Sequence, residues 1–182
     1  MNAEKYMDLQ EAIVDAGYAH EIDWCESMKP VSEEYTFWSE YAWVVINSGM
    51  KNQVAEGIWN KVKPCVTNGG SAHEVFGHKG KCNGIDLVWR DKKLLFDCYD
   101  SMPTDMKIQW LEDLPWIGGI TKWHLAKNFG MDVVKPDRHL VRVAESYGMT
   151  PTEMCEDLHK ITGDRIATVD GVIWRAANLG LI

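Results

Sequence analysis

Residues 114–142 read LPWIGGITKWHLAKNFGMDVVKPDRHLVR, and we expect the rest of the chain to be organised around them. The stretch opens with a proline turn that passes through Gly118 and Gly119. Apolar residues at helical spacing predict a packed helix over residues 121–129, and Gly130 stands where a left-handed residue commonly ends a helix. A turn that leads directly into a helix leaves backbone N–H groups without partners, and such a cluster attracts an anion, typically phosphate.

A second helix is predicted directly after Pro136, with Asp137 as its N-cap. Residues 131–135 are expected to be extended, because a residue that precedes proline avoids the helical region. Backbone N–H groups and the helix dipole favour a negative charge at the start of a helix. The stretch therefore combines a phosphate-binding turn with a fixed negative charge. Cleavage of a sugar–base bond in DNA would need both.

These residues resemble the helix-hairpin-helix (HhH-GPD) superfamily of DNA glycosylases. The family's hairpin reads L-P-G-x-G-x-K and is followed by a catalytic aspartate in a D-x-H-x-x-R-like setting. The chain has LPWIGGIT at 114–121 and KPDRHLVR at 135–142. Residues 45–54, VINSGMKNQV, resemble the family's loop whose tip enters the DNA stack, and residues 169–175, VDGVIWR, are similar to a closing helix. The resemblance covers roughly residues 32–182 and keeps the order of the elements.

The resemblance implies an all-α fold of two lobes, with a helix-hairpin-helix motif and a DNA-binding cleft. Within this single unit, one lobe is expected to comprise residues 1–30 and 137–182, and the other residues 31–136. The implied partner is double-stranded DNA with a damaged or modified base. Asp137 is the expected catalytic residue, which would stabilise the positive charge that builds on the deoxyribose and orient or deprotonate the attacking water. The alternative for Asp137 is an N-cap that only starts a helix.

The other site residues that the resemblance implies fall into three groups. The group expected to bind DNA phosphate comprises Gly118, Gly119, Ile120, Thr121 and Lys122. The group expected to enter the gap left by a flipped nucleotide comprises Met50, Asn47 and Lys51. The candidates for the base pocket are Trp38, Trp43, Trp123 and His139. Each group has a structural alternative. The hairpin can be an ordinary tight turn, and Met50 can fill a corner of the core. The tryptophans can belong to the core, and His139 can serve only the fold.

Two residues of the hairpin depart from the family pattern. Members that also nick the strand carry a Schiff-base lysine two residues after the second glycine of the family's hairpin. When the chain is aligned on Leu114 and Pro115, that glycine corresponds to Gly118 and the lysine position to Ile120. Lys122 lies two residues further on and is expected on a different side of the helix. The resemblance therefore implies a hydrolytic, monofunctional glycosylase without lyase chemistry. Trp116 stands where the family usually has glycine, which makes the turn bulkier.

The formal net charge of −8 argues against simple coating of DNA, for which a basic surface supplies the affinity. Acidic residues crowd residues 1–40 and 153–157. The basic residues around the organising stretch are Lys122, Lys127, Lys135, Arg138 and Arg142. This distribution predicts an acidic rear and a mildly basic binding face.

The five cysteines are widely scattered, which predicts free thiols in a reducing compartment. Only Cys155 lies in the C-terminal part, so the iron–sulfur cluster of some family members is not expected. The spacings of His73, His78, Cys82 and Cys98 match no zinc pattern, and we expect neither a metal nor a cofactor. No apolar stretch is long enough to span a bilayer. We therefore expect a cytoplasmic or nucleoid-associated protein, in the host cytoplasm if viral. A monomer is also expected.

Capping residues and apolar periodicity predict the remaining elements. The predicted helices cover residues 3–16, 32–47, 52–62, 71–77, 85–99, 104–111, 150–161 and a last segment to about residue 178. Residues 63–70 are expected to be a linker, and residues 78–84 a polar loop.

Two other functions fit the same sequence. The first is an enzyme of the same fold that remodels hypermodified thymine bases in phage DNA by displacing a group on the base, as some viral relatives are thought to do. The second is a non-catalytic module that recognises distorted DNA without cutting any bond.

Overall fold

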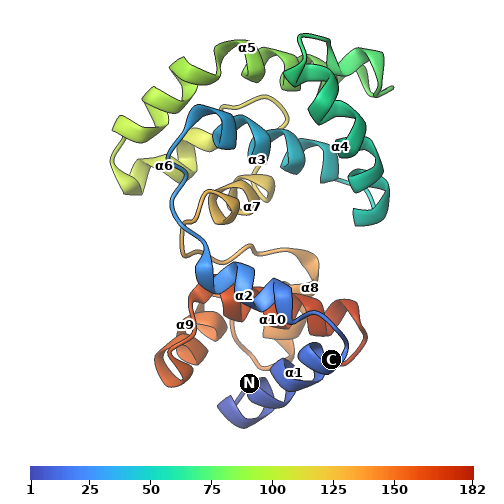
Figure 1. Cartoon of the computed structure of the whole chain (residues 1–182). Coiled ribbons are helices and arrows are strands. Elements are labelled where there is room, and N and C mark those ends of the chain that lie inside the picture. Colours follow the sequence, from blue (N-terminus) through green and yellow to red (C-terminus); the bar gives the residue numbers. More distant parts are fainter. The chain divides into compact units, whose positions relative to one another are not determined.

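The computed structural model describes all 182 residues, which form ten α-helices, one short 3-10 helix and no strand (Figure 1). The all-α prediction is therefore confirmed. The elements are α1 (Ala3–Asp15), α2 (Ala19–Ser27), α3 (Glu34–Asn47), α4 (Asn52–Thr67), η1 (Ala72–Glu74), α5 (Lys79–Ser101), α6 (Thr104–Leu111), α7 (Thr121–Asn128), α8 (Arg138–Ser146), α9 (Pro151–Thr162) and α10 (Ile166–Asn178). None of these helices is both long enough and apolar enough to cross a membrane.

The chain forms two compact units. The terminal unit comprises Met1–Lys29 and Gly130–Ile182, and the central unit comprises Pro30–Phe129. The second boundary lies directly after α7 and not at the expected residues 136–137.

The segment between α7 and α8 belongs to the terminal unit because it is bound to α10. Asp132 Oδ1 accepts the backbone N–H of Ala167 at 2.8 Å, and Asp170 Oδ2 accepts that of Lys135 at 2.8 Å. These hydrogen bonds join residues 35 positions apart in the chain, so the sequence around the predicted boundary does not reveal them.

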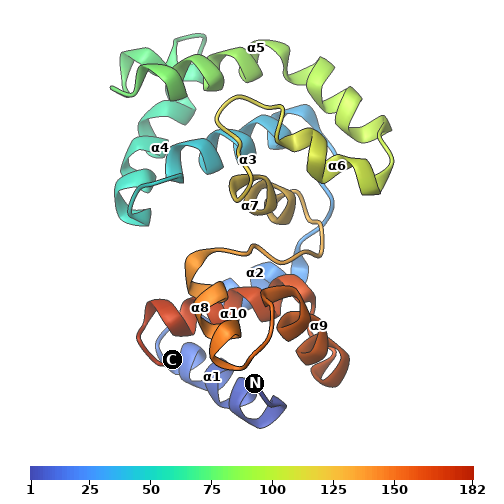
Figure 2. The same cartoon turned by 180° about the vertical axis from the view of Figure 1, so that it is seen from behind.

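The central unit is built on α3, which lies between α5 and α7 (Figures 1 and 2). Phe37, Trp38 and Tyr41 on α3 are completely buried. The ring centroids of Phe37 and Phe129 are 4.9 Å apart, and those of Trp38 and Trp89 are 4.7 Å apart. Aromatic side chains bury the largest areas in protein cores. The aromatic core of α3 therefore holds α5 on one side and α7, with the turn before it, on the other.

The terminal unit is built on α10, which packs against α1, α2, α8 and α9 (Figure 2). Val172, Ile173 and Ala176 of α10 share one apolar core with Leu140 of α8 and Ile13 of α1. The start of α8, and with it the position of Asp137, is therefore fixed by the core of the terminal unit.

The linker expected at residues 63–70 is wrong, because α4 continues through Pro64 to Thr67. Proline inside a helix removes one backbone donor and normally destabilises the helix. Here the last turn also buries Val66, which is 1% exposed, and the Thr67 hydroxyl donates to the carbonyl of Lys63 at 2.9 Å. Burial and this side-chain bond offset the loss.

The polar loop expected at residues 78–84 is also wrong, because α5 begins at Lys79. His78 is its N-cap, and the Nδ1 atom of His78 accepts the backbone N–H of Lys81 at 3.3 Å. Histidine is an uncommon N-cap, so the residue type gave no signal of a helix start.

Two glycines inside α5 are required by close packing. A Cβ atom on Gly80 would lie 2.3 Å from Cζ2 of Trp116, and one on Gly84 would lie 2.8 Å from the Tyr41 hydroxyl and 3.1 Å from Cβ of Pro115. In the sequence these glycines indicate a loop, whereas in the fold they allow the turn before α7 to approach α5.

Smaller differences concern α2, α3 and α4. Helix α2 was not predicted, and it has no side-chain cap. Helix α3 begins at Glu34 with Glu33 as its cap, and not after Ser32. The apolar periodicity of residues 52–62 predicts that Val54 of α4 is buried, but it is 53% exposed.

Unfolding at alkaline pH tests the central core. Burial raises the pKa of Tyr41 above its ordinary value of 10.0 and raises the pKa of Tyr99 to about 12. A raised folded-state pKa gives stability that is complete below pH 10.0 and is lost as the pH rises, because only the unfolded chain releases the proton. We expect the unfolding free energy to fall by roughly 1.4 kcal/mol per pH unit for each buried tyrosine above that pH.

Urea unfolding of the wild type and of Tyr41→Phe, at pH values from about 8 to about 11, measures this loss. The variant should lose less stability per pH unit than the wild type, because one titrating group is gone. Burial of Lys81 lowers the pKa of its ammonium group and affects both proteins equally. Equal slopes in the two proteins would contradict the burial of the Tyr41 hydroxyl.

Candidate functional site

Asp137 caps α8, as predicted. Its Oδ1 atom accepts the backbone N–H groups of His139 at 2.9 Å and Leu140 at 3.1 Å. Its Oδ2 atom lies 3.8 Å from Nζ of Lys135, and the Asp137 side chain is 15% exposed. The helix therefore fixes one carboxylate oxygen, while the other faces a lysine and takes part in neither N-cap bond.

The segment that leads to Asp137 is held at several points by α10 and its N-cap. In addition to the bonds of Asp132 and Asp170, the Arg165 guanidinium donates to the carbonyl of Gly130 at 3.1 Å. Asp170 is 2% exposed. The sequence leaves open whether Asp170 is solvated or bonded to the backbone, and its bond to Lys135 depends on the tertiary fold.

The turn before α7 is anchored to α3 and has a strained residue. The Tyr41 hydroxyl donates to the carbonyl of Pro115 at 2.8 Å. Trp116 has a φ of 63°, and it is the only residue other than glycine with a positive φ. This left-handed conformation is unusual for a bulky side chain and costs free energy. The tryptophan thus occupies a backbone conformation that glycine adopts easily.

Fewer groups are available to bind a phosphate at the start of α7 than the sequence predicts. The N–H of Gly118 donates to the Thr121 hydroxyl at 2.7 Å, so it is already occupied. The backbone N–H groups of Gly119, Ile120 and Thr121 have no acceptor within the protein. Gly119 and Ile120 are exposed. Three consecutive donors at the start of α7 therefore remain for an external acceptor.

Lys122 is engaged in an ion pair within the central unit. Its Nζ atom lies 2.5 Å from Oε2 of Glu112 and donates to Oε1 of Gln109 at 3.2 Å. The ion pair lowers the pKa of Glu112. The positive charge of Lys122, expected to face phosphate, is therefore compensated.

The predicted basic face is reduced by similar contacts. Lys127 is 8% exposed, and Arg142 donates to the carbonyl of Ile182 at 3.1 Å. The terminal unit has 8 Lys and Arg against 15 Asp and Glu, whereas the central unit has 11 against 12. The acidic surplus thus belongs to the terminal unit, which contains Asp137, and the central unit is almost neutral.

The loop expected to enter the DNA stack follows the end of α3. Asn47 is the last residue of that helix, Met50 is half-buried, and Lys51 is exposed. Beneath this loop, the buried ammonium group of Lys81 donates to the carbonyls of Ile46 at 3.1 Å and Ser48 at 2.6 Å. Lys81 therefore fixes the end of α3, a role that its position in an expected polar loop did not indicate.

The four candidates for the base pocket occupy different environments. Trp38 is completely buried and donates its indole N–H to the carbonyl of Ile85 at 3.2 Å, so its ring belongs to the core. Trp43 and Trp123 are partly exposed in the central unit. His139 is partly exposed in the terminal unit. No group of three or more His, Cys, Asp or Glu side chains in the chain could hold a metal ion.

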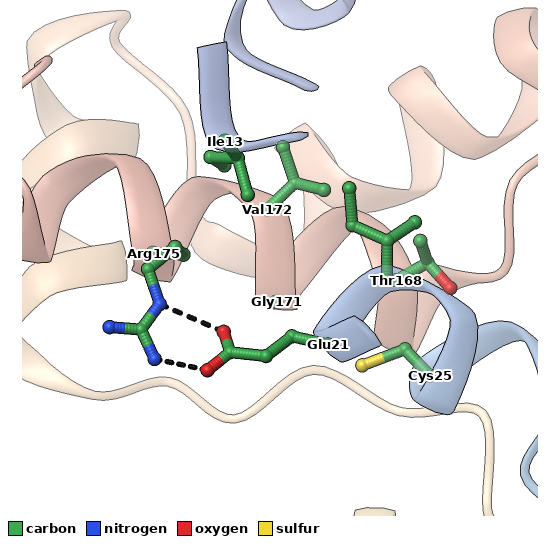
Figure 3. Close-up of a pocket in the computed structure, with 8 residues that line it drawn as sticks. Ile13, Glu21, Cys25, Thr168, Gly171, Val172 and Arg175 are labelled. Carbon is green, nitrogen blue, oxygen red and sulfur yellow. Dashed lines mark hydrogen bonds and ion pairs between the residues drawn. The ribbon is translucent and has the colours of Figure 1, made fainter. Parts of the chain in front are cut away.

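A small pocket in the terminal unit lies between α2 and α10. Figure 3 shows Glu21 paired with Arg175 beside it, with Cys25 and Thr168 in its lining. The Thr168 hydroxyl is the only buried polar side-chain atom in the chain without a hydrogen-bond partner. The pocket has room for about one water molecule. It is too small for a nucleobase and is not a candidate for the base pocket.

Substitution of Asp137 separates its capping role from its charge. Asp137→Ala should lower the unfolding free energy by about 1 kcal/mol, because two backbone N–H groups lose their acceptor. Asp137→Asn should change it little, since asparagine caps helices as well as aspartate does. Urea unfolding of the three proteins near neutral pH measures both differences. Equal losses in the two variants would show that the charge, and not the cap, supports α8.

Comparison with known protein families, with curated proteins and with solved structures gave no match to this chain. The functional interpretation therefore depends on the two features described above. They are the row of free N–H donors at the start of α7 and the carboxylate of Asp137 at the start of α8.

Proposed function

We propose that the chain is a monofunctional DNA N-glycosylase, which flips a damaged or modified base out of the duplex and hydrolyses its bond to deoxyribose. The observation that carries the proposal is the carboxylate of Asp137. Its Oδ1 atom is fixed by two N–H groups of α8, and its Oδ2 atom lies outside those bonds. Such an oriented carboxylate can oppose positive charge that develops on a sugar.

In the proposed reaction Asp137 has two tasks. As the bond between base and sugar breaks, positive charge builds on the deoxyribose, and the carboxylate stabilises it. The same carboxylate orients or deprotonates the water that attacks the anomeric carbon. The products are the free base and an abasic site. A neutral amide in this position would keep the N-cap but would not offset the developing charge.

The helix-hairpin-helix motif of the proposal consists of α6, the following turn and α7. Its contact with DNA is a backbone phosphate bound by the N–H groups of Gly119, Ile120 and Thr121, which have no acceptor within the protein. Contacts of this kind position a duplex without reading its sequence. They also need no basic side chain, which agrees with the nearly neutral charge of the central unit.

Hydrolysis is favoured over lyase chemistry by the side chains at the start of α7. The residue in the position of the family's Schiff-base lysine is Ile120, and the amine of Lys122 is paired with Glu112. Borohydride trapping with an abasic duplex should therefore give no covalent adduct. An adduct through Lys122 would contradict the monofunctional assignment.

A second candidate function is favoured by the charge of the terminal unit. Its 15 Asp and Glu against 8 Lys and Arg would attract a base that carries a cationic substituent. An enzyme that remodels such a hypermodified thymine would leave an altered base attached to its sugar. Mass spectrometry of the nucleosides after incubation distinguishes the two reactions, because only the glycosylase releases free base.

Base release by Asp137→Asn is the central test of the proposed function. The wild type should release base from one member of a panel of duplexes, each of which carries one modified base. The variant should release it at least about a hundredfold more slowly, because the amide has no charge to stabilise the transition state. Its affinity for the same duplex should be unchanged.

Asp8→Asn is the matched control, since Asp8 is an exposed acid on α1, in the same unit as Asp137. This variant should release base at the wild-type rate. Equal rates in wild type and Asp137→Asn would contradict the glycosylase proposal. Binding without base release by any of the proteins would instead favour a non-catalytic reader of distorted DNA.

A further inference from the structure

Trp116 is a strained and half-exposed residue in the turn before α7. Its side chain and backbone together are 49% exposed, and its φ of 63° is unfavourable for a bulky residue. Backbone strain is tolerated where the surrounding structure holds it in place, and it is concentrated at functional sites. Because the backbone conformation disfavours a bulky residue, the tryptophan is expected to have a role that offsets this cost.

The inner side of the Trp116 ring is held against α5. A Cβ atom on Gly80 would lie 2.3 Å from Cζ2 of the ring, and one on Gly84 would lie 3.3 Å from Cδ1. The ring of His78 meets the ring of Trp116 edge-on, at 5.0 Å between centroids and an angle of 86°. The ring is thus fixed on its inner side, and only its outer part can contact another molecule.

The chemistry around the exposed part suits a nucleotide. Gly119, Ile120 and Thr121, on the same turn, offer free backbone N–H groups. His78 is exposed and uses Nδ1 as an acceptor, which leaves its Nε2 atom as a donor. The nearby negative charge of Glu112 is paired with Lys122. An aromatic surface beside several donors fits a ligand with an apolar ring and an anionic group.

We propose that Trp116 is a DNA-contacting residue, whose exposed ring packs against the nucleotide next to the phosphate that the turn binds. This inference rests on the proposed function, because it assumes that the chain binds DNA. It goes beyond the proposal in assigning to the turn an apolar contact in addition to its backbone N–H groups. Aromatic contacts of this kind are sequence-tolerant, since every nucleotide has an apolar face.

The test measures binding of a short fluorescein-labelled duplex by fluorescence anisotropy. Trp116→Gly should weaken binding at least about tenfold, because one aromatic contact is lost. It should not lower the melting temperature, since glycine adopts a φ of 63° without strain. Trp24→Ala is the matched control: Trp24 is 46% exposed on α2, and its loss should leave the affinity unchanged. Equal affinities of wild type and Trp116→Gly would overturn the inference.

A second variant keeps the test valid if Trp116→Gly destabilises the central unit. Trp116→Phe retains an aromatic ring against α5 and should bind the duplex with an affinity close to that of the wild type. DNA should quench part of the tryptophan fluorescence of the wild type, and this quenching should be much weaker in Trp116→Phe. Undiminished quenching in this variant would show that the ring does not touch DNA and would overturn the inference.

The inference and the proposed function can fail separately. If Trp116→Gly binds normally while base release still depends on Asp137, the inference is wrong and the glycosylase proposal stands. If Trp116→Gly binds weakly but no base is released, the DNA contact stands and the glycosylase proposal is wrong. If the wild type binds no DNA, both are wrong.

Discussion

The geometry of the central unit depends on how the turn before α7 is seated against α3 and α5. The hydrogen bond from the Tyr41 hydroxyl to Pro115 fixes the start of this turn. The approach to α5 is possible only because Gly80 and Gly84 lack side chains. Tyr41 itself is held in the aromatic core of α3. The orientation of the free N–H donors on α7 is therefore set by packing that begins in the core.

The carboxylate of Asp137 depends on a different core. Asp132 and Asp170 bind the backbones of α10 and of the preceding segment, and Arg165 binds the carbonyl of Gly130. These bonds fix the entry to α8 from the side of α10. The N–H donors before α7 and the carboxylate of Asp137 are thus each supported within a separate unit. A substitution in one core is expected to disturb one feature and leave the other in place.

The sequence predicted those features whose cause lies within a few neighbouring residues. Asp137 was predicted as the N-cap of α8 because a cap and the N–H groups it binds are at most three residues apart. Features with distant causes were missed. Gly80 indicates a loop unless the ring of Trp116 is placed beside it, and Lys81 appears solvated until the carbonyls at the end of α3 surround it.

The energetic cost of the turn at Trp116 shows that stability alone does not explain why a tryptophan occupies this position. A left-handed backbone at a bulky residue costs about 1–2 kcal/mol. Each of the two glycines in α5 costs about 1 kcal/mol of helix propensity. Half-burial of a tryptophan removes roughly 100 Å² from water, which contributes about 2.5 kcal/mol. At position 116 itself the burial gain exceeds the backbone cost by only about 1 kcal/mol, so a glycine there would serve the fold almost as well. The proposed contact of the exposed half of the ring with DNA offers a reason for a tryptophan at this position that does not depend on stability.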